Sequence, residues 1–294
     1  MDGADKLVGQ TIAGKYQLVR VVGSGGMGVV YEARNSLFGK RVALKLIDAK
    51  NDPSGELAER LRREARATAR IESDSIVQVF DVGEDEEHGI FLVMEFLLGE
   101  GLDARTAKGA MDPQTAIFVA HRVAKVLARA HAAGIVHRDL KPANVFIVTR
   151  EDGSTNVKVL DFGLAKVFDK NALRLTQMGA ILGTPQYMSP EQARSVEDLD
   201  GRTDIWALGC ILYECLAGQP VFPDLGSPHQ TLMHVVEHAP QSLATVAPWV
   251  HPVLVSLVDM LLVVDREHRM RDMVTLVRHL EHAAPFVDGR ISQP

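Results

Sequence analysis

The sequence predicts an α+β protein with two parts, a strand-rich N-terminal third and a mainly helical remainder. Five segments in the first third carry the alternating or β-branched apolar residues that are typical of strands. One segment of helical spacing lies between the third and the fourth of them, and helical spacing dominates beyond residue 99. With 294 residues, the chain can bury a large core as one domain or as two closely coupled lobes.

Composition and charge are those of an ordinary soluble chain. Apolar residues make up 46% and charged residues 24%, and the net charge of −6 provides no global basic field for nucleic acid or anionic lipid. The N-terminus lacks the basic flank and apolar core of a signal peptide, and no apolar run is long enough to span a membrane. We therefore expect a cytoplasmic chain that has no nucleic-acid partner and no membrane segment.

Both cysteines lie in the apolar run of residues 205–216. At their spacing on a helix, Cys210 and Cys215 point to different faces, which argues against a disulfide between them. We expect them to be buried apolar residues of a protein from a reducing compartment.

Two strands flank a glycine-rich segment near the N-terminus. Residues 16–22 alternate as a strand, Gly-Ser-Gly-Gly-Met-Gly occupies residues 23–28, and a second strand covers residues 29–34. Glycines let a backbone approach phosphates closely. A dinucleotide-binding fold requires a helix after the glycines, whereas a strand follows here, so we favour a hairpin that covers phosphates. A glycine-rich turn without a ligand is the alternative.

One lysine interrupts the apolar third strand, residues 42–47. Lys45 either extends to the surface along its aliphatic stem or points inward toward phosphates, where it needs a carboxylate to orient it. The helix predicted over residues 56–71 offers Glu64 and Glu59 as that carboxylate.

The remaining strands and the first long helix follow in order. Residues 76–81 and 90–96 complete a five-stranded antiparallel sheet, with a turn at residues 85–89. Residues 99–102 break the strand pattern, and residues 113–133 have the apolar spacing of a helix.

The stretch around which the chain is organised is His-Arg-Asp-Leu-Lys-Pro-Ala-Asn, residues 137–144, between a helix end and an apolar run. Such a loop is a rigid mount for chemistry. Asp139 could accept a hydroxyl proton, Lys141 could hold a phosphoryl oxygen, and Asn144 could supply an oxygen to a divalent metal ion. A second carboxylate, Asp161, follows a hairpin whose turn is predicted at residues 152–153. This combination is suited to phosphoryl transfer.

Together with Asp-Phe-Gly at residues 161–163 and Gly-Thr-Pro-Gln-Tyr-Met-Ser-Pro-Glu at residues 183–191, these motifs resemble the signatures of the bacterial, eukaryotic-like Ser/Thr protein kinases. The resemblance implies a bilobal fold, with a small five-stranded antiparallel N-lobe plus one regulatory helix and a larger, mainly helical C-lobe. The implied catalytic domain spans residues 14–285 (N-lobe about 14–96, C-lobe about 99–285), between an N-terminal extension, 1–13, and a C-terminal tail, 286–294.

The resemblance also implies the catalytic and metal-binding roles. Asp139 would orient and finally deprotonate the acceptor hydroxyl, and Lys141 would steady the transferred group. Asn144 and Asp161 would hold Mg²⁺, with Mn²⁺ as an alternative.

The resemblance places ATP between the glycine-rich segment and the apolar walls of a pocket. Lys45, oriented by Glu64, would contact the α- and β-phosphates, while Glu59 would form exposed ion pairs with Arg62 or Arg63. The residues assigned to phosphate cover, pocket walls and hinge are Gly23, Gly25, Gly28, Val30, Ala43, Met94, Glu95, Leu97 and Phe146. For Val30, Ala43 and Phe146, simple core packing would look identical, and for the ribose contact both Glu100 and Asp103 stay open.

The last set of implied roles is structural and regulatory. Arg138 would pair with a phosphorylated residue of the activation segment, for which we predict Thr176, with an unmodified loop threonine as the alternative. Thr184 would lie near Asp139 and Lys141. Ser189 replaces the alanine of the family's Ala-Pro-Glu motif. Two anchors are also expected: Arg269 for Glu191, and Asp204 for the backbone of the catalytic loop.

The resemblance implies a kinase that acts on Ser/Thr hydroxyls of proteins, since a lysine stands two positions after Asp139, and that self-associates for trans-autophosphorylation. The alternatives are a pseudokinase that binds nucleotide or partners without turnover, and a small-molecule phosphotransferase. The motif His-Val-Val-Glu-His at residues 234–238 fits an inverted zinc-protease pattern, but no convincing third ligand follows it.

Overall fold

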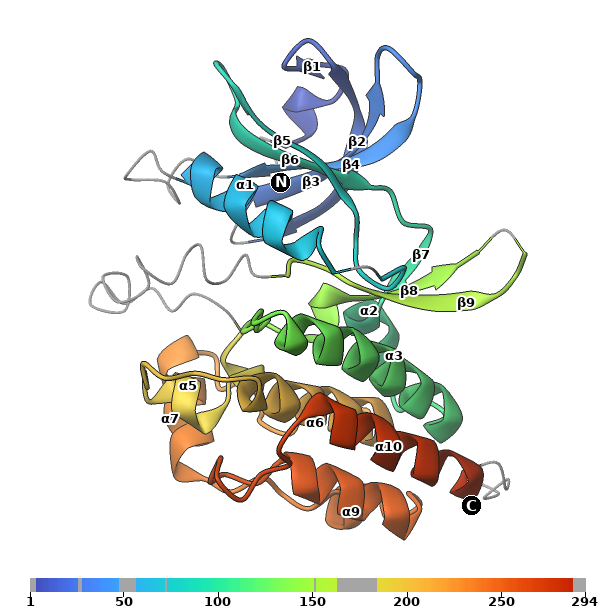
Figure 1. Cartoon of the computed structure of the whole chain (residues 1–294), viewed down its shortest axis with the longest axis vertical. Coiled ribbons are helices and arrows are strands. Elements are labelled where there is room, and N and C mark those ends of the chain that lie inside the picture. The colour runs from blue at the N-terminus through green and yellow to red at the C-terminus, as the bar shows by residue number, and fades with distance from the viewer. Residues whose placement is uncertain are drawn as a thin grey trace. The chain divides into compact units, whose positions relative to one another are not determined.

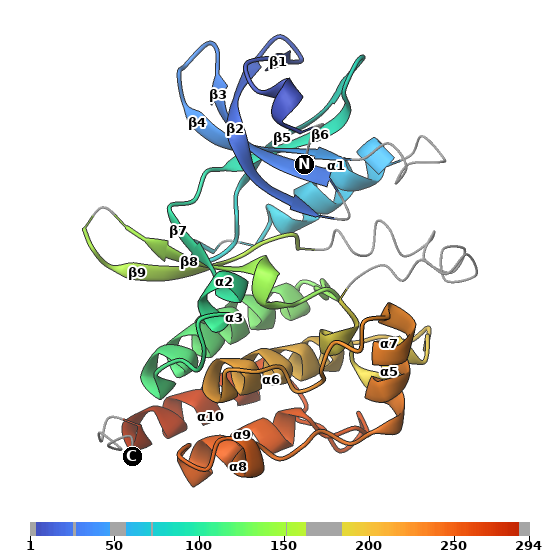
Figure 2. The same cartoon turned by 180° about the vertical axis from the view of Figure 1, so that it is seen from behind.

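The computed structural model describes residues 4–25, 28–47, 57–71, 73–150, 152–162 and 184–287. The chain forms two units, which Figures 1 and 2 show from opposite sides. The first unit comprises Met1–Glu72 and Val77–Leu98, and the second comprises Ser73–Ile76 and Gly99–Pro294.

The first unit is built on an antiparallel sheet of six strands in the order β1-β2-β3-β4-β6-β5. The strands are β1 (Thr11–Ile12), β2 (Tyr16–Gly25), β3 (Gly28–Asn35), β4 (Arg41–Ile47), β5 (Val79–Asp85) and β6 (Gly89–Glu95). All five predicted strands are therefore present. Side chains of one face form an apolar core that includes Leu18, Tyr31, Leu44 and Phe91.

The sixth strand, β1, comes from the segment that we predicted as an N-terminal extension. Ile12 is fully buried in the sheet core. The backbone N–H of Ala13 donates to the Asp85 carboxylate at 2.7 Å, and His88 Nδ1 lies 2.7 Å from the same carboxylate. These bonds, that from Ala13 foremost, lower the pKa of Asp85 to about 2. A strand of two residues is too short for its alternation to be recognised in the sequence.

Strand β5 begins later than predicted, at Val79 rather than Ile76. Ile76 instead forms an isolated parallel bridge with Val159, and the N–H of Val159 donates to the carbonyl of Ser75 at 2.9 Å. Residues 73–76 thus belong to the second unit. The alternation of the segment predicts extended backbone, but it does not indicate which sheet that backbone joins.

Helix α1 (Leu57–Thr68) packs in the first unit beside β5 and buries Leu57 and Leu61. Arg62 on its outer face bonds Glu59 at 2.7 Å and Glu84 of β5 at 3.3 Å. The predicted exposed ion pair of Glu59 is therefore confirmed.

Helices form most of the second unit. They are α2 (Leu102–Thr106), α3 (Pro113–Ala132), α5 (Pro190–Ala193), α6 (Arg202–Ala217), α7 (Pro228–Glu237), α8 (Leu243–Val246), α9 (Pro252–Leu261) and α10 (Met273–Ala283). Helix α3 packs against both α6 and α10 (Figure 1). Helix α6 is buried along nearly its whole length, which explains why apolar residues occur on all of its faces. None of the helices in the described ranges has the length and hydropathy needed to cross a bilayer.

Helix α6 carries both cysteines. Cys210 and Cys215 are buried and free, as predicted. Burial raises the pKa of the Cys215 thiol to about 12, and it raises that of Cys210 as well, so both stay protonated and unreactive at neutral pH.

The second unit also contains a three-stranded antiparallel sheet, with β7 (Gly99–Gly101), β8 (Val145–Thr149) and β9 (Thr155–Val159) in that order. The predicted hairpin turn is present, because the N–H of Ser154 donates to Asp152 at 2.9 Å. Residues 99–101 were predicted only as a break in the pattern, yet they form β7. A Cβ on Gly99 would lie 2.0 Å from the carbonyl oxygen of Ile147, so only glycine permits this pairing.

Candidate active site

The predicted site residues are divided between the two units. The first unit contains Gly23, Gly25, Gly28, Val30, Ala43, Lys45, Glu64, Met94, Glu95 and Leu97, and the second contains Arg138, Asp139, Lys141, Asn144, Phe146, Asp161 and Thr184. Thr176 lies outside the described residues.

In the first unit, the glycine-rich segment joins β2 and β3 as an antiparallel hairpin, in which Gly25 pairs with Gly28. Gly28 has a φ of +142°, and a Cβ there would lie 1.9 Å from the carbonyl oxygen of Leu46, so the sheet itself requires this glycine. A Cβ on Gly23 or Gly25 would meet nothing within 4 Å. The fold does not need glycine at these two positions, and open backbone there fits a segment that receives a ligand's phosphates.

Lys45 lies on the central strand β4, opposite Val30 of β3 and Leu92 of β6. The residue is only 8% exposed, so the interpretation of Lys45 as a surface lysine is wrong. A buried ammonium group requires a charged or polar partner. Glu64 is half-buried on α1, and its pairing with Lys45 stays a prediction.

In the second unit, the loop of residues 137–144 brings three of the predicted site side chains together. The carboxylate of Asp139 accepts hydrogen bonds from Lys141 Nζ at 2.9 Å and from Asn144 Nδ2 at 3.2 Å. Asn144 Nδ2 also donates to the backbone carbonyl of Asp139 at 2.7 Å. Because the amide nitrogen of Asn144 faces Asp139, its oxygen is directed elsewhere, as a metal ligand would need.

Asp161 is placed beside this loop by the residue before it. The N–H of Leu160 donates to the carbonyl of Asn144 at 2.8 Å, and the carbonyl of Leu160 lies 3.0 Å from His137 Nε2. Asp161 has a φ of +51°, and the ring of Phe162 lies 4.8 Å from that of His137. The loop therefore holds the chain on both sides of Asp161. A carboxylate and an amide oxygen are the hard donors that Mg²⁺ prefers.

Asp204 of α6 holds the backbone of the loop of residues 137–144, as predicted. Its carboxylate accepts the backbone N–H of His137 and that of Arg138, each at 2.9 Å. His131 Nε2, at the end of α3, lies 2.8 Å from it. Burial raises the pKa of Asp204, but these hydrogen bonds and the charge of His131 outweigh it, so the pKa is lowered and the carboxylate stays ionised.

His131 was missed by the sequence analysis. It stands in the last turn of α3, and no motif marks it. The signal that was available is a histidine in the last turn of a helix, shortly before the loop of residues 137–144.

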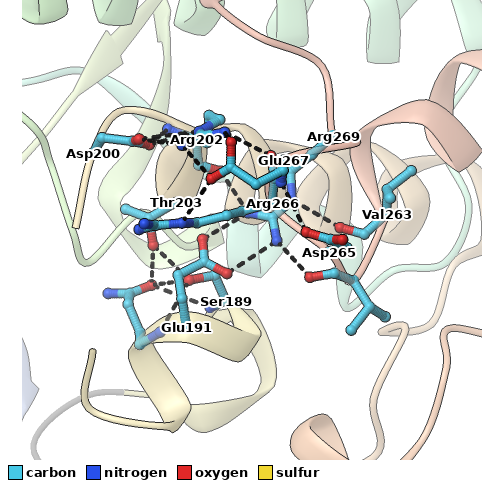
Figure 3. Close-up of polar contacts among 12 residues, drawn as sticks. Ser189, Glu191, Asp200, Arg202, Thr203, Val263, Asp265, Arg266, Glu267 and Arg269 are labelled. Carbon is cyan, nitrogen blue, oxygen red and sulfur yellow. Dashed lines mark hydrogen bonds and ion pairs between the residues drawn. The ribbon is translucent and has the colours of Figure 1, made fainter. Parts of the chain in front are cut away.

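The predicted anchor of the activation segment is also confirmed (Figure 3). Arg269 Nη1 and Nη2 bond the two carboxylate oxygens of Glu191 at 2.7 and 3.0 Å. The other N–H groups of Arg269 donate to the carbonyls of Arg202, Val263 and Val264, so all five donors are satisfied. Its guanidinium also lies 5.0 Å from the Trp206 ring. The burial of this ion pair is thus accompanied by full hydrogen bonding.

A small pocket adjoins the loop of residues 137–144 within the second unit. Its lining includes Asp139, Leu140, Thr184, Tyr187 and Met188. Thr184 thus lies near Asp139, on the same pocket. Tyr187 is fixed there by a hydrogen bond of 2.6 Å to the buried Glu214.

The two histidines of the motif that fits a zinc-protease pattern pack against each other. The rings of His234 and His238 lie 4.1 Å apart, and His234 also packs edge-on against Phe222. In the part of the chain that the structure describes, no group of three or more His, Cys, Asp and Glu side chains is arranged to hold a metal ion.

Comparison with known proteins gives consistent matches. The family model "Protein kinase domain" matches residues 16–281. Serine/threonine-protein kinase Pkn1 of Myxococcus xanthus is 41% identical over 244 residues, which are 82% of this chain and 34% of that protein. Serine/threonine-protein kinase PknA of Mycobacterium tuberculosis is 37% identical over 238 residues, 79% of this chain and 54% of that protein. The chain therefore spans about a third to a half of these relatives.

Among solved structures, the kinase domain of PknI from Mycobacterium tuberculosis superposes with a TM-score of 0.72 at 24% sequence identity. The match covers 93% of this chain and 98% of that one, and it shows the bilobal kinase fold.

We predict that Arg269→Met lowers the free energy of unfolding by about 3–5 kcal/mol at pH 7, because it leaves the Glu191 carboxylate buried without its partner. Urea denaturation measures this loss. The matched control is Arg266→Met, whose ion pairs with Asp198 and Glu267 are exposed, and it should cost less than about 1 kcal/mol.

The same pair has a predictable pH dependence. Burial raises the pKa of Glu191, but the hydrogen bonds and charge of Arg269 lower it further, so the folded-state pKa lies below the unfolded value. The stabilisation is therefore complete above the unfolded pKa and is lost as the pH falls through the folded one. The difference in the free energy of unfolding between wild type and Arg269→Met should become smaller below about pH 4. A difference that becomes larger there would contradict this assignment.

Proposed function

The chain belongs to the protein kinase family, and on that premise we propose that it is a Ser/Thr protein kinase that transfers the γ-phosphoryl group of ATP to Ser/Thr hydroxyls of proteins. The observation that carries the proposal is the hydrogen-bonded cluster of Asp139, Lys141 and Asn144, with Asp161 tied beside it through Leu160. A complete cluster of this kind favours chemistry over mere binding.

In this proposal, Asp139 receives the acceptor hydroxyl as a hydrogen-bond donor and takes its proton as the new O–P bond forms. The bond from Asn144 to the Asp139 backbone keeps that carboxylate in one orientation. Lys141, at 2.9 Å from Asp139, is close enough to place its positive charge on the transferred group. Positioning and charge neutralisation are the main demands of phosphoryl transfer.

Asn144 and Asp161 would hold Mg²⁺ or Mn²⁺, since both offer hard oxygen donors. When bound, the metal ion supplies positive charge that offsets the charge developing on the phosphoryl oxygens.

The nucleotide would be held largely by the first unit. Gly23 and Gly25 carry no steric role in the sheet, which supports phosphate cover by their backbone. Lys45, oriented by Glu64, would contact the α- and β-phosphates. Adenine would lie against the apolar side chains of Val30, Ala43, Met94 and Phe146, and would bond the backbone of Glu95 and Leu97.

We also propose that phosphorylation of Thr176 activates the enzyme through Arg138. A phosphothreonine carries close to two negative charges at neutral pH and would pair with a guanidinium next to the catalytic aspartate. Trans-autophosphorylation would supply that phosphate when two copies meet, and Thr184 would lie in the path of the acceptor. The alternative function is a pseudokinase, and a measured transfer of phosphate distinguishes the two.

The function is tested by incubating the protein with labelled Mg-ATP and a generic basic protein. Asp139→Asn removes the proton acceptor and should lower transfer by on the order of a hundredfold or more. The matched control is Asp259→Asn on the exposed face of α9, which should transfer as wild type does. Chelation of divalent metal should abolish labelling, and added Mg²⁺ or Mn²⁺ should restore it. Nucleotide binding without any transfer by wild type would indicate a pseudokinase.

Thr176→Ala tests the proposed switch. Loss of the phosphate acceptor should hold the enzyme at the low activity of phosphatase-treated wild type, and mass spectrometry of wild type should find phosphate on residue 176. Thr245→Ala, at an exposed position of α8, is the matched control. Full activity of Thr176→Ala, with no phosphate on that residue in wild type, would refute the switch.

A further inference from the structure

Gln192 of α5 makes hydrogen bonds in two directions. On one side, its Oε1 accepts the backbone N–H of Ser189 at 3.1 Å and the hydroxyl of Thr203 at 2.8 Å. On the other side, its Nε2 donates to the backbone carbonyl of Arg138 at 2.7 Å. One side chain therefore connects α5, the start of α6 and the catalytic loop, across 54 positions of sequence to Arg138.

The capping of α5 explains why residue 192 has a side-chain oxygen. Ser189 and Gln192 form a capping box at the start of α5, in which the Ser189 hydroxyl accepts the N–H of Gln192 and the Gln192 oxygen accepts the N–H of Ser189. Glutamate fills this position of a capping box as well as glutamine does. The cap therefore gives no reason for an amide nitrogen, and among the described residues only the bond to Arg138 uses it.

Arg138, whose carbonyl accepts that bond, has an unusual backbone conformation. Its φ of +66° lies in the left-handed region, which is unfavourable for a residue with a side chain. Its N–H is held by Asp204 at 2.9 Å, and its carbonyl is held by Gln192. Arg138 directly precedes Asp139. These two bonds therefore fix the orientation of the backbone that leads into Asp139, the proposed proton acceptor.

We propose that Gln192 is a positioning residue for Asp139, which acts by holding the Arg138 carbonyl and thereby the left-handed turn before the catalytic carboxylate. This inference rests on the proposed kinase function and adds to it. Thr203 keeps the amide of Gln192 in the orientation that faces Arg138, because its hydroxyl donates to the amide oxygen at 2.8 Å. Ser189, the departure from Ala-Pro-Glu in this sequence, supplies the helix cap.

The test is Gln192→Glu. The substitution keeps an oxygen for Ser189 and Thr203 but places a carboxylate oxygen against the Arg138 carbonyl, so it removes one donor and leaves the cap. We expect kcat to fall by about tenfold or more, with KM for ATP within about twofold and a melting temperature only slightly below that of wild type. Protonation of the introduced carboxylate restores a donor, so its activity relative to wild type should rise as the pH is lowered.

Ser189→Ala is the matched control, because it breaks the cap on the other side and leaves the Gln192 amide in place. It should lower the melting temperature and leave kcat within about threefold of wild type, since a lost cap costs stability.

Hydrogen exchange provides a readout that does not depend on activity. In Gln192→Glu, the amides of His137 and Arg138 should exchange about tenfold faster, while those of α5 should not change. If wild type transfers phosphate and Gln192→Glu matches it in kcat and in exchange, the positioning role is wrong. If wild type transfers no phosphate, the kinase proposal fails, and the exchange rates alone decide whether Gln192 holds the loop.

Discussion

The buried carboxylate of Asp204 is the constraint on which the rest of the second unit depends. A charge that is 1% exposed is costly unless hydrogen bonds replace its water, and Asp204 obtains them from two backbone N–H groups of the catalytic loop and from His131. The requirement extends to the neighbouring sequence. A Cβ on Gly201 would lie 2.5 Å from His131 Nδ1, so the residue before α6 must be small for the histidine to reach Asp204.

Polar contacts join the loop of residues 137–144 to the elements around it. The bidentate pair of Glu191 and Arg269 ties α5 to the segment after α9, and Arg269 also donates to the carbonyls of Val263 and Val264 in that segment. Gln192 carries the connection onward to Arg138. Directional bonds of this kind specify one arrangement, whereas apolar packing tolerates several. A loop that must hold a left-handed residue beside Asp139, the proposed proton acceptor, requires such specification.

Much of the fold could be predicted, because it follows from local patterns. The five longer strands, α1, α3 and the hairpin at Asp152 have clear alternation, spacing or turn residues. Three features have no such pattern and were not predicted. Strand β1 has only two residues, and β7 depends on a glycine that leaves room for the carbonyl of Ile147. Residues 73–76 contact β9 rather than the first sheet.

The candidate site shows the same division. Asp139, Lys141, Asn144 and Asp161 could be located by motif, and Asp204 and Arg269 by resemblance. His131 and Gln192 could not, because no motif marks them and only the folded chain brings them to their partners. Ser189 was visible as a departure from a motif, but sequence order does not reveal the 2.6 Å contact between its hydroxyl and that of Thr203.

The central claim is that Asp204 holds the catalytic loop, and amide hydrogen exchange in Asp204→Asn tests it most directly. Asparagine preserves the size of the side chain but removes its charge and turns an NH₂ group toward N–H donors. The account predicts that the amides of His137 and Arg138 lose protection by at least about tenfold, which corresponds to about 1.4 kcal/mol, while α3 and α6 stay protected. Unchanged protection at both amides would contradict it.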